Sequence, residues 1–168
     1  MCEKKDLRPS QRGIYLVYMK IRDVMHSPVL SLPFDTSYED AARFLFENDI
    51  TGAPVTNDAG DVIGIISEKD LYRVLYPYYR SFYETPELYT DFESREAKVD
   101  EIKRNPIERF MTREVVTARP EDPIMKVGGI MIARGIHRMP VLDEAGTMIG
   151  IVTRRDIYRT IIKARLGM

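Results

Sequence analysis

The chain has little of what marks secreted or membrane proteins. Its 168 residues include one cysteine, Cys2, which cannot form a disulfide within the chain and fits a reducing environment. The apolar runs, such as Val62–Ile66 and Met148–Val152, have strand length, far short of the roughly 20 residues of a membrane span. The first residues are polar and charged, unlike a secretory signal. We therefore expect a cytoplasmic protein with no membrane partner.

An excess of charge of one sign is also missing. The chain has 25 Lys and Arg residues against 26 Asp and Glu, which gives a formal net charge of -1. No overall positive field would attract nucleic acid. The basic residues between 103 and 113 alternate with acidic ones, as on a solvated mixed-charge face. We therefore expect no nucleic-acid partner.

Catalytic patterns are absent as well. The two histidines, His26 and His137, lie too far apart in the sequence to suggest a metal site, and no glycine-rich phosphate loop of the P-loop type occurs. The sequence offers no nucleophile with an adjacent base and no paired acids in a common motif. We expect no enzyme activity, no catalytic cofactor and no bound metal.

What the chain does contain is an internal repeat. At an offset of 86 residues, the segment from Val24 to Leu75 aligns without a gap with the segment from Phe110 to Ile161. In letters, APVTNDAGDVIGIISEKDLYR corresponds to MPVLDEAGTMIGIVTRRDIYR. Two such copies predict two similar units, packed about a pseudo-twofold axis with a cleft between them where function would lie.

Each copy predicts the element order β-α-β-β-α, in the α/β (α+β) class. Short apolar stretches at 28–30 and 115–116 are the expected first strands. A hairpin with a glycine at positive φ should join the next two strands. The final helices are expected over 68–76 and 154–166.

The first helix of each copy carries its own start signal. Thr36 with Glu39 has the spacing of a capping box, and Asp122 before Pro123 is typical of an N-cap followed by proline at the first helical position. Gly135 should end the helix of the second copy. The pair Gly128-Gly129 within that helix predicts close packing at a dimer interface or a broken helix.

These boundaries divide the chain into four parts: an N-terminal segment 1–22, a first domain 23–76, an aromatic-rich connector 77–105 and a second domain 106–168. The connector could pack on the domains or on a dimer mate, or serve as a docking arm or a lid. The sequence leaves these alternatives open.

A hydroxyl followed three residues later by aspartate recurs where each last strand meets its helix, as Ser67 with Asp70 and Thr153 with Asp156. Helix capping alone would explain one such pair. Aspartate, however, is shorter than the Glu or Gln that a capping box prefers, so it should reach the cap less well. The carboxylate would then be available to accept hydrogen bonds from a sugar diol.

The whole repeated pattern, including x-Pro-Val, an acidic-Gly turn, Ile-Gly-Ile and Ser/Thr-x-x-Asp, resembles the cystathionine-β-synthase (CBS) domain, and the tandem resembles a CBS pair or Bateman module. The resemblance implies a regulatory module that binds AMP, ADP or ATP, and less often S-adenosylmethionine. It also implies a homodimer and an effector protein that the sequence does not name.

Carried over by position, the resemblance implies two related ligand sites. The hydroxyl and aspartate pairs would hold ribose, and further residues would line the base pocket. The implied lining residues are Ile50, Thr51, Gly52, Ile136, His137 and Arg138, with Ser27, Val29, Val115 and Thr117.

The copies differ at one implied contact. His137 and Arg138 resemble a pair that contacts phosphate in some family members, whereas the first copy has Thr51 and Gly52 there. We therefore expect the site around Asp70, closed by this basic pair, to bind phosphate better. The alternative function is a protein-interaction or scaffold module with empty or degenerate ligand clefts.

Overall fold

The computed structural model describes residues 18–75 and 100–166. Most of the predicted connector, from 77 to 99, lies outside the described residues, as does most of the predicted N-terminal segment. The described residues form two compact units. The first unit contains 30–75 and 100–115, and the second contains 18–29 and 116–166.

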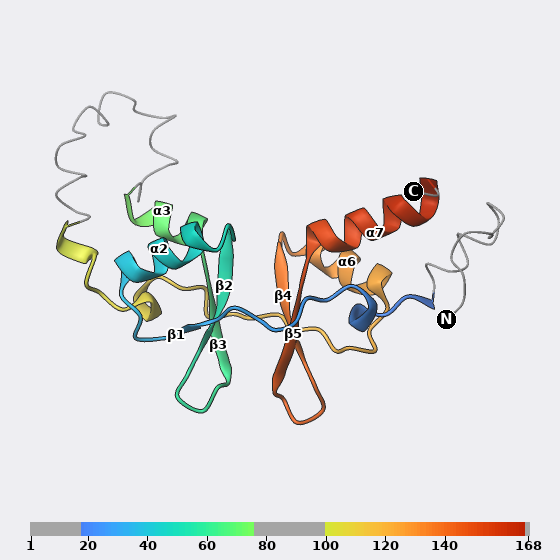
Figure 1. Ribbon diagram of the computed structural model, residues 1–168, viewed down its shortest axis with the longest axis horizontal. Helices are drawn as coiled ribbons and strands as arrows, with labels where there is room; N and C mark the ends of the chain where they lie inside the picture. The colour runs from blue at the N-terminus through green and yellow to red at the C-terminus, as the bar shows by residue number, and fades with distance from the viewer. Residues whose placement is uncertain (1–17, 76–99, 167–168) are drawn as a thin grey trace. The chain divides into compact units, whose positions relative to one another are not determined.

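The first unit is a three-stranded sheet with two main helices, in the predicted order β-α-β-β-α (Figure 1). The strand order is β1-β2-β3, with β1 parallel and β3 antiparallel to β2. Its elements are β1 (Leu32–Pro33), α2 (Tyr38–Glu47), β2 (Gly52–Thr56), β3 (Val62–Ser67), α3 (Glu68–Leu75) and the short 3-10 helix η3 (Ile107–Arg109).

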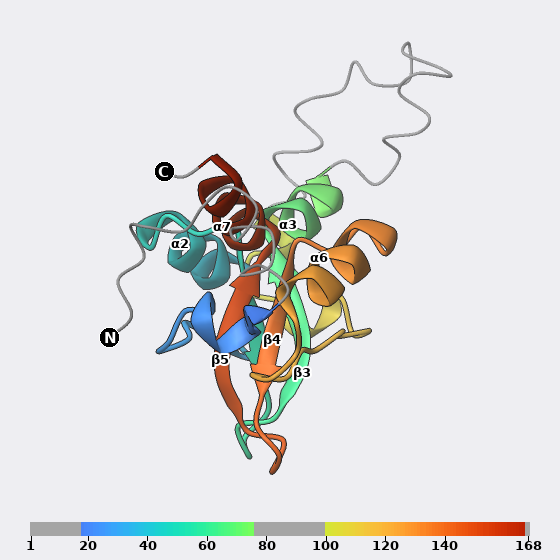
Figure 2. The ribbon, with the colours of Figure 1, turned by 90° about the vertical axis from the view of Figure 1, so that its right-hand side faces the viewer.

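The second unit repeats this arrangement around an antiparallel β4-β5 hairpin. Within each unit, the hairpin turn projects beyond the helices, which lie toward the other end of the strands (Figures 1 and 2). The elements of this unit are the 3-10 helix η1 (Ile21–Asp23), α6 (Ile124–Ala133), β4 (Arg138–Leu142), β5 (Met148–Thr153) and α7 (Arg154–Leu166).

The predicted hairpins are confirmed in both units. Gly60 and Gly146 have φ values of 86° and 85°, a conformation that glycine adopts without the steric cost of a side chain. The two hairpins also bury the same positions, one strand with three consecutive buried residues and the other with alternating ones. The repeat in sequence is therefore a repeat in packing.

The first strand of each copy is shorter and later than predicted. The first copy pairs at Leu32 and Pro33 rather than at 28–30, and the second has a single bridge, Ala118 to Val141, rather than a strand at 115–116. Extending either pairing toward the N-terminus would require an amide hydrogen from Pro54 or Pro140. Proline has none, so the ladder stops there.

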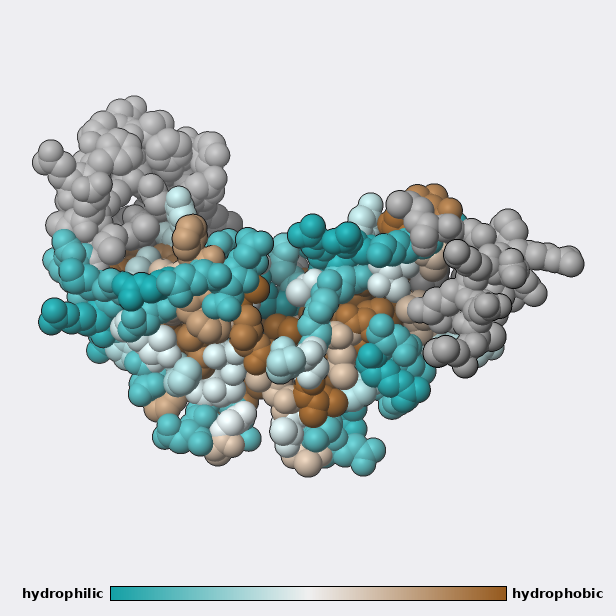
Figure 3. Space-filling model, in the orientation of Figure 1, coloured by the Kyte–Doolittle hydropathy of each residue, from teal (hydrophilic) through white to brown (hydrophobic). Residues whose placement is uncertain are grey.

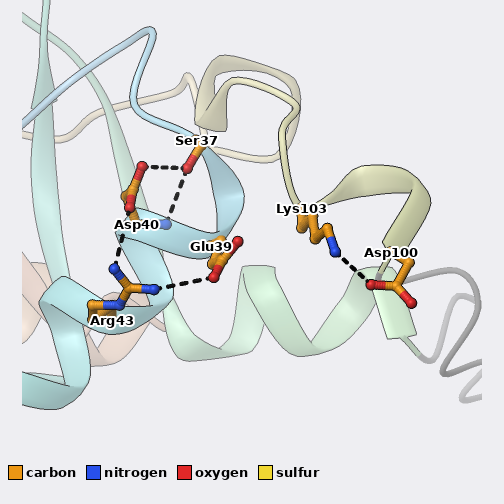
Figure 4. Close-up of polar contacts among 6 residues, drawn as sticks. All are labelled: Ser37, Glu39, Asp40, Arg43, Asp100 and Lys103. Atoms are coloured by element: carbon orange, nitrogen blue, oxygen red, sulfur yellow. Dashed lines mark hydrogen bonds and ion pairs between the residues drawn. The ribbon is translucent and has the colours of Figure 1, made fainter.

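The predicted cap of α2 is wrong by one residue. Ser37 is the N-cap, and its Oγ accepts a hydrogen bond of 3.1 Å from the backbone amide of Asp40 while donating to the carboxylate of Asp40 at 2.6 Å. Figure 4 shows these two side chains pointing at each other, with Arg43 reaching both Glu39 and Asp40. Glu39 thus pairs with Arg43 instead of closing a capping box with Thr36.

The helix α6 also begins one residue later than predicted. Pro123 occupies the N-cap position and Ile124 begins the helix, so Asp122 is not the cap. The Asp122 carboxylate instead accepts hydrogen bonds from the Lys126 ammonium and, more weakly, from the Arg119 amide. These bonds hold the pKa of this carboxyl below its ordinary value against the opposing effect of burial. Gly135, with φ of 66°, follows the helix end as predicted.

Each unit is completed by a segment that precedes the other repeat in the sequence. Ile21 is fully buried in the core of the second unit, and Ile107 is fully buried in the core of the first. Residues 23–29 therefore pack with the second repeat, and 106–115 with the first, which differs from the predicted domains 23–76 and 106–168. Full burial of one such side chain contributes about 1.5–3 kcal/mol.

The exchanged segments also explain two glycines in the last strands. A Cβ at Gly150 would lie 2.6 Å from Sδ of Met25, and one at Gly64 would lie 2.3 Å from Sδ of Met111. A larger residue at either position would force the neighbouring methionine side chain to shift. The Ile-Gly-Ile element of the repeat is therefore a packing requirement of the exchanged segments.

Of the two explanations predicted for the glycine pair in α6, the broken helix is wrong, and packing at a dimer interface stays a prediction. The helix is continuous from Ile124 to Ala133, so it is not broken. A Cβ at Gly128 would approach Cγ2 of Ile157 in α7 to 3.1 Å, whereas a Cβ at Gly129 would meet no atom within 4 Å. Gly128 thus serves the packing of α6 on α7 within one unit.

We expect Gly129→Ala to raise the free energy of unfolding by about 0.5–1 kcal/mol, because alanine is the better helix former and its methyl group meets open space. Gly128→Ala, the matched control one residue away, should gain less or lose stability because its methyl group presses on Ile157. Denaturant unfolding of the two variants measures the difference. Equal gains would contradict this account of the packing.

Candidate functional site

The two predicted hydroxyl and aspartate pairs lie at equivalent places, each where the last strand of a unit runs into its final helix. Ser67 ends β3 and Asp70 lies in the first turn of α3, while Thr153 ends β5 and Asp156 lies in the first turn of α7. We call these places the first corner and the second corner. All four side chains are partly buried.

One oxygen of each carboxylate is held by the helix cap. Oδ2 of Asp70 accepts from the amide and hydroxyl of Ser67 at 2.9 and 2.5 Å, and Oδ2 of Asp156 accepts from the amide and hydroxyl of Thr153 at 3.0 and 2.5 Å. The expectation that aspartate would reach the cap poorly is therefore wrong. Capping therefore uses one of the two oxygens of each carboxylate and fixes the orientation of the group.

The other oxygen, Oδ1, distinguishes the two corners. At the first corner the nearest donor is Oγ1 of Thr112, 3.5 Å away, which is longer than an ordinary O–H···O bond. At the second corner Nε2 of His26 lies 3.1 Å from Oδ1 of Asp156. Asp70 thus retains an acceptor oxygen with only a weak partner, whereas the corresponding oxygen of Asp156 has a close donor.

His26 and Thr112 are the residues that sequence analysis missed. They are separated by the repeat offset of 86 residues, and each is held by two backbone hydrogen bonds to its neighbouring strand, His26 to Ile151 of β5 and Thr112 to Ile65 of β3. The repeat alignment shows that the two positions are equivalent. It does not show that each serves the aspartate of the other copy.

Burial and hydrogen bonding act in opposite directions on Asp156. Burial raises its pKa, but the hydrogen bonds from Thr153 and His26 outweigh burial and hold the pKa of this carboxyl below its ordinary value of 3.8. The ionised form is therefore favoured by folding. Its contribution to stability is present above about pH 4 and is lost as the pH falls through the lowered pKa.

The predicted base-pocket residues adjoin these corners through the backbone. In the first unit, Gly52 pairs in register with Ser67, and the carbonyl of Thr51 accepts from the amide of Glu68 at 3.2 Å. Ile50, just before them, packs against the core of this unit. These residues therefore belong to one local structure with the first corner.

The second unit repeats the arrangement with different side chains. Arg138 pairs in register with Thr153, and the carbonyl of His137 accepts from the amide of Arg154 at 2.9 Å. The guanidinium of Arg154 also lies 3.2 Å from Nδ1 of His137. Ile136 packs against the core, as Ile50 does. A histidine and two arginines thus gather beside the second corner.

The other four predicted lining residues are Ser27, Val29, Val115 and Thr117. Among the described residues, no hydrogen bond joins the side chain of any of them to either carboxylate. Ser27 and Thr117 are exposed, and Val29 and Val115 are half-buried. Their role in a base pocket stays a prediction, as does the closure of the first corner by His137 and Arg138.

No group of three or more metal-ligating side chains occurs within residues 18–75 and 100–166. No helix there has the length and apolar composition needed to cross a bilayer.

Comparison with known proteins places this fold. A model of the CBS domain matches residues 21–77 and again 107–163, which together make up most of the chain. The chain belongs to the CBS domain family. The resemblance inferred from the repeat is confirmed, and with it the mixed α and β fold.

Among solved structures, the CBS domain of a CBS domain-containing membrane protein from Sphaerobacter thermophilus is 32% identical, with a TM-score of 0.70 over 89% of this chain and 92% of that one. The CBS domain pair of protein MJ0100, solved in complex with 5'-methylthioadenosine and S-adenosyl-L-methionine, is 26% identical, with a TM-score of 0.64 over 85% and 95% of the two chains. That CBS domain pair therefore binds adenosine-type ligands.

The curated relatives differ in the share of their length that the match covers. The uncharacterized protein MJ1426 of Methanocaldococcus jannaschii is 33% identical over 156 residues, which is 86% of this chain and 92% of that protein. The A-adding tRNA nucleotidyltransferase of Aquifex aeolicus is 32% identical over 145 residues, but the match covers only 15% of that enzyme. CBS pairs thus occur both as most of a protein and as a small part of a larger enzyme.

The geometry of the second corner predicts a pH-dependent stability difference. Asp156→Asn should lower the free energy of unfolding at pH 7 by about 1 kcal/mol, because the amide keeps an acceptor for Thr153 but loses the charge-assisted bonds. The loss relative to the unchanged protein should disappear as the pH falls well below 3.8, where the aspartate is itself protonated. Denaturant unfolding across this pH range measures it, and a loss that persisted at low pH would contradict the role of the charge.

Proposed function

We propose that this chain is a regulatory module that binds an adenosine-type ligand, with AMP, ADP or ATP preferred over S-adenosylmethionine. The observation that carries the proposal is that the helix cap uses only one of the two oxygens of each carboxylate. The cap holds Oδ2 and so fixes the position of Oδ1, where a ribose diol could donate hydrogen bonds. Oδ1 has only a weak partner at the first corner, whereas at the second corner a diol would compete with His26. The relative MJ0100 supports this ligand class.

The basic side chains of the second unit favour a phosphorylated ligand. Arg138 lies opposite Thr153 in the β4-β5 pairing, and Arg154 and His137 adjoin it. Charge-assisted hydrogen bonds to a phosphate contribute about 1.5–3 kcal/mol each where they are desolvated. The equivalent positions of the first unit, Thr51 and Gly52, supply no charge.

In a regulatory module, ligand binding must alter a second protein. A ligand can shift a conformational equilibrium only by binding one state better than the other. The chain itself would catalyse nothing, and an effector protein would read its state.

Ligand binding should raise the melting temperature of the folded protein. We expect AMP, ADP or ATP at millimolar concentration to do so, and S-adenosylmethionine to do so less. Asp70→Asn and Asp156→Asn should each reduce the shift, since each retains a cap acceptor but loses the charge that a diol would contact. Arg138→Ala should reduce the shift with nucleotides more than the shift with unphosphorylated adenosine.

The matched control is Asp58→Ala, which removes an exposed carboxylate in the β2-β3 turn and should leave every shift unchanged. The absence of a shift with any ligand would overturn the proposal and favour a scaffold with empty ligand sites. An unchanged nucleotide shift in Arg138→Ala would overturn only the phosphate assignment.

We further propose that the module forms a homodimer through its helices. Figure 3 shows hydrophobic patches among the hydrophilic residues of each unit. Large apolar side chains are exposed at repeat-equivalent positions, Phe46 and Ile132 at 85% and 72%, and Tyr72 and Tyr158 at 64% and 62%. Exposure of this kind on both copies fits a surface that a second copy covers.

Light scattering during size-exclusion chromatography tests the dimer. The unchanged protein should elute with twice the chain mass, and the double variant Phe46→Glu with Ile132→Glu should shift toward the monomer. Lys126→Glu, a charge change at an exposed position on α6, is the control and should stay dimeric. A monomeric unchanged protein would overturn the homodimer.

A further inference from the structure

We propose that His26 makes sugar binding at the second corner dependent on pH, whereas the first corner, with Thr112 at the same position, binds a sugar equally well from about pH 5 to 8. The inference rests on the proposed function and extends it. It concerns the contacts of Oδ1, the carboxylate oxygen that the helix caps leave available.

The two corners have the same backbone and differ in one neighbouring side chain. Thr112 and His26 are fixed by the same pair of backbone hydrogen bonds to the last strand, and both side chains lie next to Oδ1 of the aspartate. The threonine hydroxyl is 3.5 Å from Asp70, and the histidine ring nitrogen is 3.1 Å from Asp156. A sugar hydroxyl that donates to Oδ1 would therefore compete with the distant Thr112 hydroxyl at the first corner. At the second corner it would compete with the closer His26 ring.

The strength of the competitor at the second corner depends on its charge. Histidine is the side chain that changes charge between about pH 5 and 8. A protonated ring makes a charge-assisted bond to the carboxylate, about twice as strong as the bond from a neutral donor. Threonine does not ionise in this range. Competition for Oδ1 should therefore weaken with rising pH only where His26 is the neighbour.

The charged surroundings of His26 support this assignment. From α7, the group that faces the ring is the Asp156 carboxylate, and from β5 the neighbour is the backbone of Ile151. On its own segment, Asp23 accepts from the Lys20 amide. On α7, Arg154 contacts Nδ1 of His137. Asp156 itself stays ionised throughout, since its pKa lies below 3.8.

The direction and size of the effect follow. The His26 side chain is 65% exposed, and ion pairs of exposed groups are weak. We therefore expect affinity at the second corner to rise about two- to fivefold from pH 5.5 to pH 8. Affinity at the first corner should stay constant over the same range.

The probe for this test is 5'-methylthioadenosine, measured by isothermal titration calorimetry. It carries the ribose diol but no phosphate, and a phosphate would itself ionise near pH 6. Asp70→Asn isolates the second corner, and Asp156→Asn isolates the first. Both substitutions keep a cap acceptor, and unfolding midpoints at each pH confirm that the variants are folded.

Exchanging the two neighbours provides the matched control. In the Asp70→Asn background, His26→Thr should abolish the pH dependence and leave the affinity at pH 5.5 near the value seen at pH 8. In the Asp156→Asn background, Thr112→His should introduce a two- to fivefold rise with pH at the first corner.

The outcomes separate this inference from the proposed function. No binding by the unchanged protein at any pH overturns both. Binding by the unchanged protein that is lost in Asp70→Asn at every pH overturns this inference alone, because the second corner would then hold no sugar. A pH dependence that survives His26→Thr, or a second corner with no pH dependence, also overturns it.

Discussion

The exchange of segments between the two repeats is the constraint on which the rest of the structure depends. Ile21 and Ile107 are each fully buried in a core built mainly by the other copy, and Met25 and Met111 pass over the glycines of the last strands. Small units bury limited apolar surface, so a buried isoleucine contributed by a remote segment is a substantial part of their stability. The same exchange brings His26 and Thr112 beside the carboxylates.

Each of these carboxylates has a structural role through one oxygen, and the proposed ligand contact concerns the other oxygen. Here one oxygen of Asp70 closes the cap of α3 while the other has only a distant partner. A cap that orients the group makes it a better acceptor, because less freedom is lost when a ligand binds.

The two copies have the same backbone arrangement, but the side chains beside their corners differ. Hairpin register, burial pattern and turn glycines agree between them. The side chains beside the corners do not, since the second unit gathers His26, His137 and Arg138 where the first has Thr112, Thr51 and Gly52. The proposed differences in ligand preference and in pH response rest on these side chains, because the backbone at the two corners is the same.

The sequence by itself determined the repeat, the hairpins, the extent of α7 and the positions of both hydroxyl and aspartate pairs, because each depends on local pattern: alternating burial, a glycine at positive φ, a fixed spacing in a helix turn. Only the tertiary structure decided the late start of β1, the cap at Ser37, the reach of Asp70 to its cap, and above all the partners of Oδ1. Those features depend on which distant segment lies alongside a strand, and the repeat alignment alone does not say whether His26 serves Asp70 or Asp156.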